Sequence, residues 1–273
     1  MNNMQKKYTC AYQFYSYDEN SYFHLKKKFL RTFHHIIEER IPEDLNVSLK
    51  EIVFSMEDRP IITLEGDNEE DLVFMINILK EITGMVRDAK EIRKGDVMYG
   101  LLKNVGKFGF GLFVDVGIKN PEKDVLLPLH YLRDILVDGE KMSLTDIVEL
   151  YGFMNHFPVE IKIVDIEKDK KGQFKYNAEF SDFTLERFQI WVEDGFEMMF
   201  STGVARQSVK KTIAKRGHTQ DTWEVRRLGP LETATICRTG TTAPGLIAHI
   251  GKFLPDCHFS ALRPQKVRKF WDK

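Results

Sequence analysis

The residues of this chain best able to carry out catalysis are its eight histidines and the acidic groups near them. The segment "RGHTQD" is the strongest candidate, since it places His218 and Asp221 three positions apart. It falls at the end of a predicted helix, where His and Asp are ordinary capping and turn residues, and we favour that interpretation. No HExxH, nucleophile elbow or P-loop lysine motif occurs. We therefore expect a non-catalytic protein, with an RNA-modifying or hydrolytic enzyme built around His218 as an alternative.

A second candidate for chemistry is the loop "TGTTAPG", residues 239–245. It joins a predicted strand to a helix N-terminus, where free backbone amides can hold a phosphate, and Arg238 stands beside it. The alternative is a plain helix cap by Thr241 or Thr242, with Pro244 in the first turn. The sequence favours neither interpretation. If a phosphate binds here, we expect it to belong to an RNA backbone.

The sequence gives little support for a metal site or a membrane-spanning segment. Cys10, Cys237 and Cys257 form no CxxC pair and no zinc spacing, so we expect three small buried residues in a reducing, cytoplasmic compartment. We expect no cofactor and no metal. No window holds eighteen apolar residues, and the start "MNNMQKKYTCAYQ" lacks the apolar core of a secretory signal, so we expect no membrane segment.

Aromatic and glycine residues alternate in the stretch "KNVGKFGFGLFVDVG", residues 103–117. Glycine lets strands bend and backbones approach, and an aromatic ring beside it is free to stack on a nucleobase. The alternative is that the rings fill a core. Strand parity places Phe108 and Phe110 on one face and Phe113 on the other unless a glycine bulge shifts the register, so at least one ring is expected in the core. We rank Phe110 as the most exposed, then Phe113, then Phe108.

Charge is distributed unevenly along the chain. Residues 203–273 hold fourteen Lys and Arg against five Asp and Glu, a net charge of +9, whereas the first 202 residues carry −10. A clustered basic excess predicts one face for a polyanion, although domains of opposite charge could instead attract each other. The candidate phosphate contacts are Lys210, Lys211, Lys215, Arg216, Arg226, Arg227, Arg238, Arg263 and Lys266. The alternative for each of them is a solvated surface position.

The elements that must position these residues fall into three groups. Residues 1–92 predict a β-α-β-β-α-β order: a strand over residues 8–16, a helix after Asn20 or Ser21, two strands, a helix capped by Asp67 or Asn68 and ended by Gly84, and a closing strand in "MVRDAKEI". This order indicates a ferredoxin-like α/β plait.

Residues 93–181 change to five short strands with a helical insert capped by Ser143 and a lysine-rich hairpin after Lys168. Such strands are typical of a small closed barrel. Residues 182–273 begin with a linking helix capped by Ser181 or Asp182, and then repeat a strand, Thr-Gly turn, helix and strand pattern at a shift of 37 residues. They predict a second, basic plait. The fold class is therefore α+β, a central barrel flanked by two plaits.

The barrel segment resembles the S1 domain, an RNA-binding OB barrel. The resemblance rests on "KGDVMYGLLKNVGKFGFGLFVDVGI" and "DVLLPLHYL", with matching positions at Gly95, Phe110, Phe113 and Asp115 and at residues 126–130. Pro128 stands where the family often has His, and the insert before "FPVEI" is longer than usual. The residues of this segment that we expect RNA to contact are Phe108, Phe110, Phe113, Lys103, Lys107 and His130.

Nearly the whole chain resembles an archaeal protein family, domain of unknown function 2110, through "GFGLFVDVGI", "KRGHTQD", "RLGPLE" and "RTGTTAPGLIAHIGKFLP". That family implies an S1-like barrel but no particular activity. We expect a cytoplasmic protein that binds single-stranded or structured RNA and acts in translation or RNA processing, on the ribosome or another ribonucleoprotein. A protein-binding adaptor of the transcription or RNA-processing machinery is the other alternative.

Overall fold

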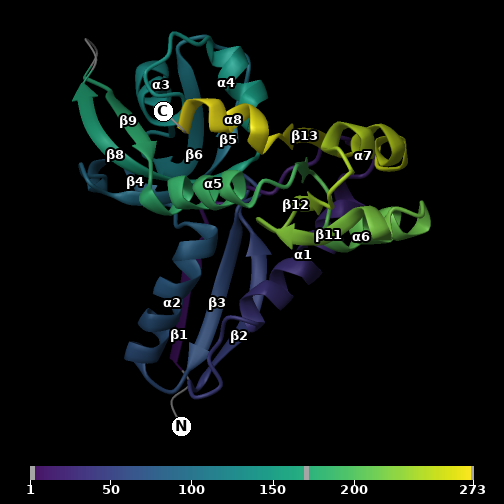
Figure 1. Cartoon of the computed structure of the whole chain (residues 1–273). Helices are drawn as coiled ribbons and strands as arrows, with labels where there is room; N and C mark the ends of the chain where they lie inside the picture. The colour runs from purple at the N-terminus through teal and green to yellow at the C-terminus, as the bar shows by residue number, and fades with distance from the viewer. Residues whose placement is uncertain (1–3, 169–171, 272–273) are drawn as a thin grey trace.

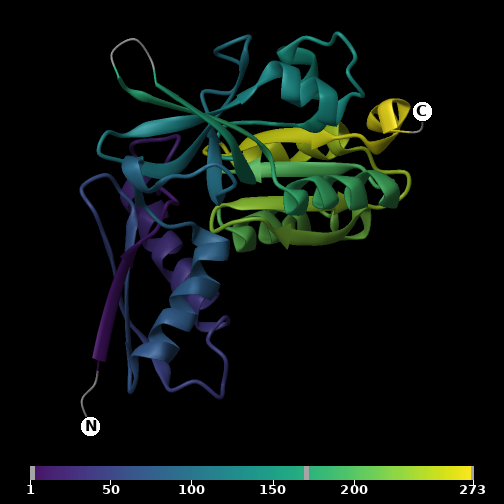
Figure 2. The same cartoon turned by 90° about the vertical axis from the view of Figure 1, so that its left-hand side faces the viewer.

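Three units make up the chain, and the computed structural model describes them over residues 4–168 and 172–271 (Figure 1). We call them the N-terminal unit, the barrel and the C-terminal unit. The N-terminal unit extends away from the other two, which lie against each other (Figure 2). The expected α+β class with a closed five-stranded barrel is confirmed. Within the described residues, no helix is both long and apolar enough to cross a membrane.

The N-terminal unit is a three-stranded sheet with two helices. Its elements are β1 (Met4–Thr9), α1 (Tyr22–Glu38), β2 (Val47–Phe54), β3 (Pro60–Gly66) and α2 (Glu69–Thr83). The sheet is antiparallel in the order β1-β3-β2. Of the two predicted caps of α2, Asn68 is the one observed, with its side chain accepting from the Asp71 amide, and Gly84 ends the helix as expected. Both helices bury apolar stripes in one core with β3.

Two predicted strands of this unit are wrong. The first strand ends at Thr9, and residues 10–17 form an irregular, largely buried segment in place of a strand. The closing segment forms only a two-residue strand, β4 (Arg87–Asp88), which pairs in parallel with Ile118 and Lys119 of the barrel and not with β1. Alternating aromatic residues produced the first error, because a buried irregular segment and a strand can share that pattern.

The barrel consists of five strands that form a closed circuit. Its elements are β5 (Val97–Lys103), β6 (Gly111–Lys119), β7 (Lys123–Pro128), α3 (Leu129–Leu136), α4 (Leu144–Tyr151), β8 (Pro158–Lys168) and β9 (Phe174–Phe180). The strand order is β6-β5-β8-β9-β7, and β7 pairs with β6 to complete the circuit. Ser143 caps α4 as predicted. In the lysine-rich hairpin, Lys170 and Lys171 lie outside the described residues.

The C-terminal unit begins with helix α5 and contains a four-stranded antiparallel sheet. Its elements are α5 (Asp182–Asp194), β10 (Met198–Thr202), α6 (Arg206–Lys215), β11 (Thr222–Arg227), β12 (Glu232–Cys237), α7 (Ala243–Ile250), β13 (His258–Leu262) and α8 (Pro264–Trp271). The strand order is β11-β12-β10-β13. Ser181 caps α5 through its hydroxyl, which was one of the two predicted caps.

One hydrophobic core joins the barrel to the C-terminal sheet. The face of that sheet with Phe200 and Ile236 packs with barrel residues, α5 and Val267 of α8. The opposite face, with Met199, packs under α6 and α7 in a separate cluster. The sheet is therefore covered by helices on one side and by the barrel and its neighbours on the other.

The irregular segment after β1 connects all three units, through what we call the tyrosine junction: Tyr12, Tyr15, Tyr17, His156 and Glu232. The Tyr12 and Tyr15 hydroxyls donate to Glu232 Oε1 at 2.8 and 2.5 Å, and Glu232 is fully buried in β12. Burial raises the pKa of Glu232 to about 7, although the two tyrosine hydrogen bonds oppose the rise. His156 stacks on Tyr15 with ring centroids 3.5 Å apart, and burial lowers its pKa to about 4.

A buried ion pair joins the N-terminal unit to the barrel. Arg59, in the turn before β3, donates from Nη2 to both carboxylate oxygens of Asp115 at 2.8 Å and also donates to the Ala11 carbonyl. Its side chain is 1% exposed. Asp115, which the sequence matched to the S1 pattern, therefore has a structural partner. A second ion pair between the N-terminal unit and the barrel, Lys119 with Glu57, is partly exposed.

Candidate functional site

Three phenylalanines lie together on the barrel surface. The ring centroids of Phe108, Phe110 and Phe113 are 5.3 to 5.8 Å apart, and we call this group the phenylalanine cluster. Phe110 is 55% exposed and Phe108 36% exposed, whereas Phe113 is half-buried. None of the three lies in the core, so the expectation of at least one core ring is wrong. Phe110 is the most exposed, as predicted, but Phe108 exceeds Phe113.

The error has a local cause. Phe108 and Phe110 lie in the loop between β5 and β6 and not in a strand, so strand parity does not apply to them. Asn104 and Gly106 adopt positive φ in this loop, and the Val105 amide donates to Asn155 Oδ1 at 2.8 Å. The loop conformation is thus fixed by hydrogen bonds and turn residues.

Gly111 explains why glycine is needed where the loop enters β6. A Cβ there would lie 2.4 Å from the Leu127 carbonyl oxygen of β7. The absence of a side chain lets β6 and β7 approach, as the sequence suggested for glycines of this stretch. Gly109 has open space around it and gives room to the neighbouring rings.

The other predicted barrel residues surround the cluster. Lys103 pairs with Phe113 across β5 and β6, and its Nζ lies 3.5 Å from Asp124 Oδ1. Lys107 places its Nζ 5.7 Å from the Phe108 centroid. His130 is exposed at the start of α3, immediately after Leu129, whose amide donates to the Phe110 carbonyl at 2.9 Å. The structure therefore brings together the six barrel residues predicted to contact RNA.

The basic residues of the C-terminal third do not gather on one face. Lys210, Lys211, Lys215 and Arg216 lie on or just after α6, which covers the Met199 side of the sheet. Arg263 directly precedes α8 and Lys266 lies in it, and α8 packs on the opposite side. The predicted single basic face is therefore wrong, because the sheet separates the two groups.

Several of these cations already have partners within the unit. The Arg216 guanidinium lies 3.3 Å from the Phe253 centroid. Arg226 pairs with Glu224 at 3.2 Å. Arg227 is half-buried, and burial lowers the pKa of its guanidinium. Lys210, Lys211 and Lys215 are exposed along one helix.

Trp223 is an exposed aromatic residue that the sequence analysis missed. Its side chain is 58% exposed on β11, and the Arg238 guanidinium lies 4.2 Å from its ring centroid. A register shift between Thr222 and Glu224 interrupts the strand at this position. Such a shift leaves no clear mark on the sequence, although a Trp in a strand of charged residues is itself a signal.

The loop at residues 239–245 forms a plain helix cap. Thr242 Oγ1 accepts from the Gly245 amide at 3.2 Å, and Pro244 lies in the first turn of α7. The Ala243 amide donates to Glu197 Oε2 at 2.8 Å. A carboxylate of the protein itself thus occupies the place where a phosphate would bind, so the capping alternative is confirmed.

His218 and Asp221 form a local contact. His218 Nδ1 lies 2.6 Å from Asp221 Oδ2, and the Asp221 amide donates to the His218 carbonyl in a turn. The His249 ring is 5.0 Å from that of His218. In residues 4–168 and 172–271, no group of three or more His, Cys, Asp or Glu side chains could hold a metal ion. All three cysteines are free and buried, as predicted.

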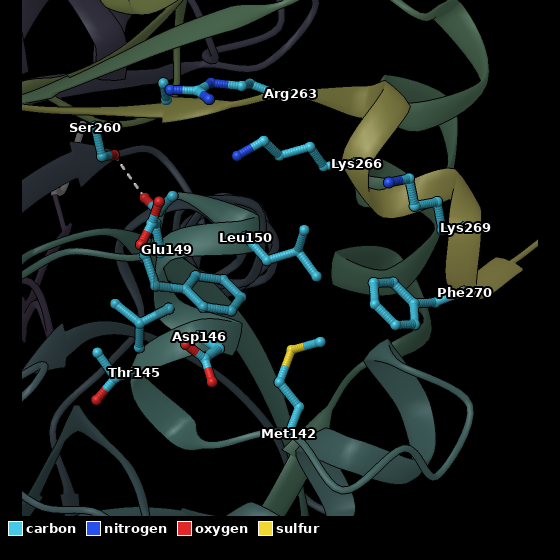
Figure 3. A pocket seen from close by; sticks show the side chains of 14 residues that line it. Met142, Thr145, Asp146, Glu149, Leu150, Ser260, Arg263, Lys266, Lys269 and Phe270 are labelled. Atoms are coloured by element: carbon cyan, nitrogen blue, oxygen red, sulfur yellow. Dashed lines mark hydrogen bonds between the residues drawn. The ribbon is translucent and has the colours of Figure 1, made fainter.

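Arg263 and Lys266 border a groove between α4 and the segment formed by β13 and α8 (Figure 3). The groove has a volume of about 700 Å³. Lys269 lies on the same wall, and Asp146 and Glu149 of α4 lie opposite. We call it the α4–α8 groove. Sequence reasoning chose two of its residues but did not find the groove, because α4 and α8 are far apart in the chain.

Comparison with known protein families adds two matches. Residues 92–192 match the DUF2110 central domain, and residues 196–262 match the DUF2110 C-terminal domain. Together the two matches span more than half of the chain.

The chain belongs to the DUF2110 family. The central domain corresponds to the barrel together with nearly all of α5, a helix that the sequence analysis assigned to the C-terminal unit. The C-terminal domain corresponds to β10 through β13. A search of curated proteins found no match.

Proposed function

We propose that this chain is a non-catalytic, cytoplasmic RNA-binding protein whose barrel holds unpaired RNA. The observation that carries the proposal is the phenylalanine cluster, three rings on the barrel surface with Lys103, Lys107 and His130 around them. Exposed rings stack on bases of any sequence, at about 1–3 kcal/mol per base. Neighbouring cations hold the phosphate backbone.

The strand circuit supports an S1-like OB assignment. The order β5-β6-β7-β9-β8, with a helical insert between β7 and β8, is that of an OB barrel. In such barrels, the second and third strands and the loop before them contact nucleic acid. The phenylalanine cluster occupies the corresponding loop and β6. The assignment to translation or RNA processing, on the ribosome or another ribonucleoprotein, rests on this fold analogy.

We further infer that both flanking units are ferredoxin-like. The C-terminal unit has the β-α-β-β-α-β order and the sheet order β11-β12-β10-β13. The N-terminal unit has the β-α-β-β-α part of that order without the closing strand, and β1 and β2 flank β3 in its three-stranded sheet. Adjacent exposed cations of α6, Lys210 and Lys211, provide a further place for phosphates.

The test is direct measurement of RNA binding with the full chain. An unstructured RNA should bind with an affinity that falls steeply as salt rises, because cations on phosphates release counterions. Changing both Phe110 and Phe113 to Ala should weaken binding about tenfold or more, from the stacking of at least one base. Phe23→Ala is the matched control, because Phe23 is 81% exposed but lies on the N-terminal unit. No RNA binding, or a flat response to salt, would refute the proposal.

A protein-binding adaptor is the second candidate function, and one observation favours it. The N-terminal unit exposes Phe23 on α1 and both Val73 and Phe74 on α2. A contiguous exposed apolar patch can mark a protein contact, and Val73 and Phe74 are adjacent on one helix. The partner would belong to the transcription or RNA-processing machinery. Capture of a partner that survives nuclease treatment, and that is lost in Phe74→Ser, would support this function.

A further inference from the structure

The α4–α8 groove carries opposite charges on its two walls. Arg263, Lys266 and Lys269 lie on the side of β13 and α8, and Asp146 and Glu149 lie on α4 (Figure 3). In the described part of the chain, none of these five residues forms an ion pair with another side chain. The Asp146 carboxylate accepts a hydrogen bond from the Ser143 hydroxyl, and the Asp146 amide donates to Ser143 Oγ in the cap of α4. Both walls therefore keep their charge available to a ligand.

The space between the walls is apolar. Met142, Leu150, Phe153 and Phe270 line it, and Phe270 presents an aromatic ring beside the basic wall (Figure 3). A concave, largely apolar space with a few charged groups at its sides is the usual form of a small-molecule site. A ligand that satisfies this groove needs a negative end, a flat apolar middle and an end that donates hydrogen bonds.

We infer that the α4–α8 groove binds a nucleotide. The phosphate lies against Arg263, Lys266 and Lys269, since cations of this kind hold phosphate oxygens. The base packs against Phe270 and Leu150. Its N–H edge points to Glu149 or Asp146, because carboxylates only accept hydrogen bonds.

Guanine fits the acidic wall best. Its N1–H and N2–H donors are adjacent, so they match the two oxygens of one carboxylate, whereas uracil offers one donor. An acidic peptide fits less well, because Asp146 and Glu149 would repel it. The nucleotide is either free or the phosphorylated end of an RNA chain. This inference goes beyond the proposed barrel function and does not depend on it.

The experiment titrates the full chain with GMP, UMP and inorganic phosphate and measures affinity by calorimetry. GMP should bind more tightly than UMP, and both should bind more tightly than phosphate. Lys266→Glu should reduce the GMP affinity at least tenfold, because one phosphate contact becomes repulsive. Lys252→Glu is the matched control, since Lys252 is an exposed lysine of the same unit outside the groove. Its GMP affinity should match that of the unchanged chain.

Glu149→Gln and Phe270→Leu test the rest of the site. Glu149→Gln should reduce GMP affinity more than UMP affinity, and Phe270→Leu should weaken both. Thermal unfolding of each variant identifies any loss of folding, and Arg263→Glu provides a second change to the basic wall. A 5′-phosphorylated short RNA that competes with GMP identifies an RNA end as the ligand, and failure to compete identifies a free nucleotide.

Three outcomes would overturn the inference. One is GMP affinity unchanged in both Lys266→Glu and Arg263→Glu. Another is equal affinity for phosphate and GMP, which would indicate an anion site without base recognition. The third is tighter binding of a polyglutamate peptide than of GMP. Because the readout uses mononucleotides and groove variants, it stays separate from the barrel test, in which Phe110 and Phe113 change.

Discussion

The phenylalanine cluster places three phenylalanines within six positions of the chain, Phe108–Phe113, and the tyrosine junction places three tyrosines within six positions, Tyr12–Tyr17. In the first, two rings are exposed in a loop. In the second, Tyr12 and Tyr15 are buried and donate hydrogen bonds to Glu232. The tyrosine hydroxyls give the second group a structural role, because a buried tyrosine needs a polar partner and can fix one segment to another.

The contrast distinguishes aromatic residues that hold the units together from aromatic residues that are free to contact a ligand. The tyrosines have their polar groups satisfied by other units of the same chain, so they hold the units together. The phenylalanines contact mainly one another and leave ring surface open, so they can contact a ligand. Variants in the two regions should therefore affect different measurements: stability for the junction and RNA affinity for the cluster.

The largest effect is expected from the ion pair beside the junction. Arg59→Ala leaves the Asp115 carboxylate buried without its partner, which should lower the free energy of unfolding by about 3–5 kcal/mol. Urea unfolding followed by circular dichroism measures the loss. Lys119→Ala is the control, because its pair with Glu57 is partly exposed and should contribute about 0–1 kcal/mol. An equal loss of unfolding free energy in the two variants would mean that burial does not strengthen the Arg59–Asp115 pair.

The second effect is a pH dependence set by Glu232. Its pKa is about 7 in the folded chain, above the ordinary value of 4.5, so the folded state holds the proton more tightly than the unfolded state. Protonated Glu232 therefore stabilises the folded state below pH 4.5. The free energy of unfolding falls by about 3 kcal/mol as the pH rises from 4.5 to about 7.

His156 acts in the opposite direction within an overlapping range. Its pKa is lowered from 6.5 to about 4, so its contribution is lost as the pH falls from 6.5 to 4. In Glu232→Gln, only the His156 trend should remain, and stability should rise between pH 4 and 6.5. Thermal unfolding across this range measures both. An unchanged pH profile in Glu232→Gln would exclude Glu232 as the source of the first trend.

The third prediction compares one variant from each aromatic group. Phe110→Ala should weaken RNA binding by about 1–3 kcal/mol and leave the unfolding free energy within about 0.5 kcal/mol. Tyr12→Phe should do the reverse, with a loss of about 1–3 kcal/mol in stability and unchanged RNA affinity, because it removes a donor from the buried Glu232. Filter binding measures the RNA affinity of both variants, and urea unfolding measures their unfolding free energy. A stability loss in Phe110→Ala as large as in Tyr12→Phe would remove the distinction.

The smallest effect concerns Lys107, which lies next to the Phe108 ring. If it contacts one phosphate, Lys107→Ala should reduce the slope of log affinity against log salt by about 0.7 for a single strand. Lys26→Ala is a suitable comparison, since Lys26 pairs with Asp58 on the N-terminal unit and should leave the slope unchanged. An identical slope in both variants would mean that Lys107 binds no phosphate.

Local patterns predicted most of the helices and their caps. Asn68, Ser143 and Ser181 cap their helices through side-chain oxygens, and each was named or offered as one of two choices, because capping depends on nearby backbone groups. The closed barrel was also predicted, because short strands separated by glycine-rich turns favour it.

What depends on distant contacts could not be predicted. Glu232 lies in a fully buried strand, and its tyrosine partners lie more than 200 positions earlier, so no window of sequence contains the pair. The α4–α8 groove likewise joins residues near 149 with residues near 266. The position of Arg87 and Asp88 on the barrel sheet was missed because a two-residue strand has no pattern of its own.

The core that the barrel shares with Phe200 and Ile236 has a consequence for dissecting the molecule. The two family segments are recognised separately, yet neither can be cut free without exposing apolar side chains that the other covers. We expect both to melt in a single cooperative transition. A ligand that binds the barrel would then raise the melting temperature of the whole C-terminal half, including helices that do not contact the ligand.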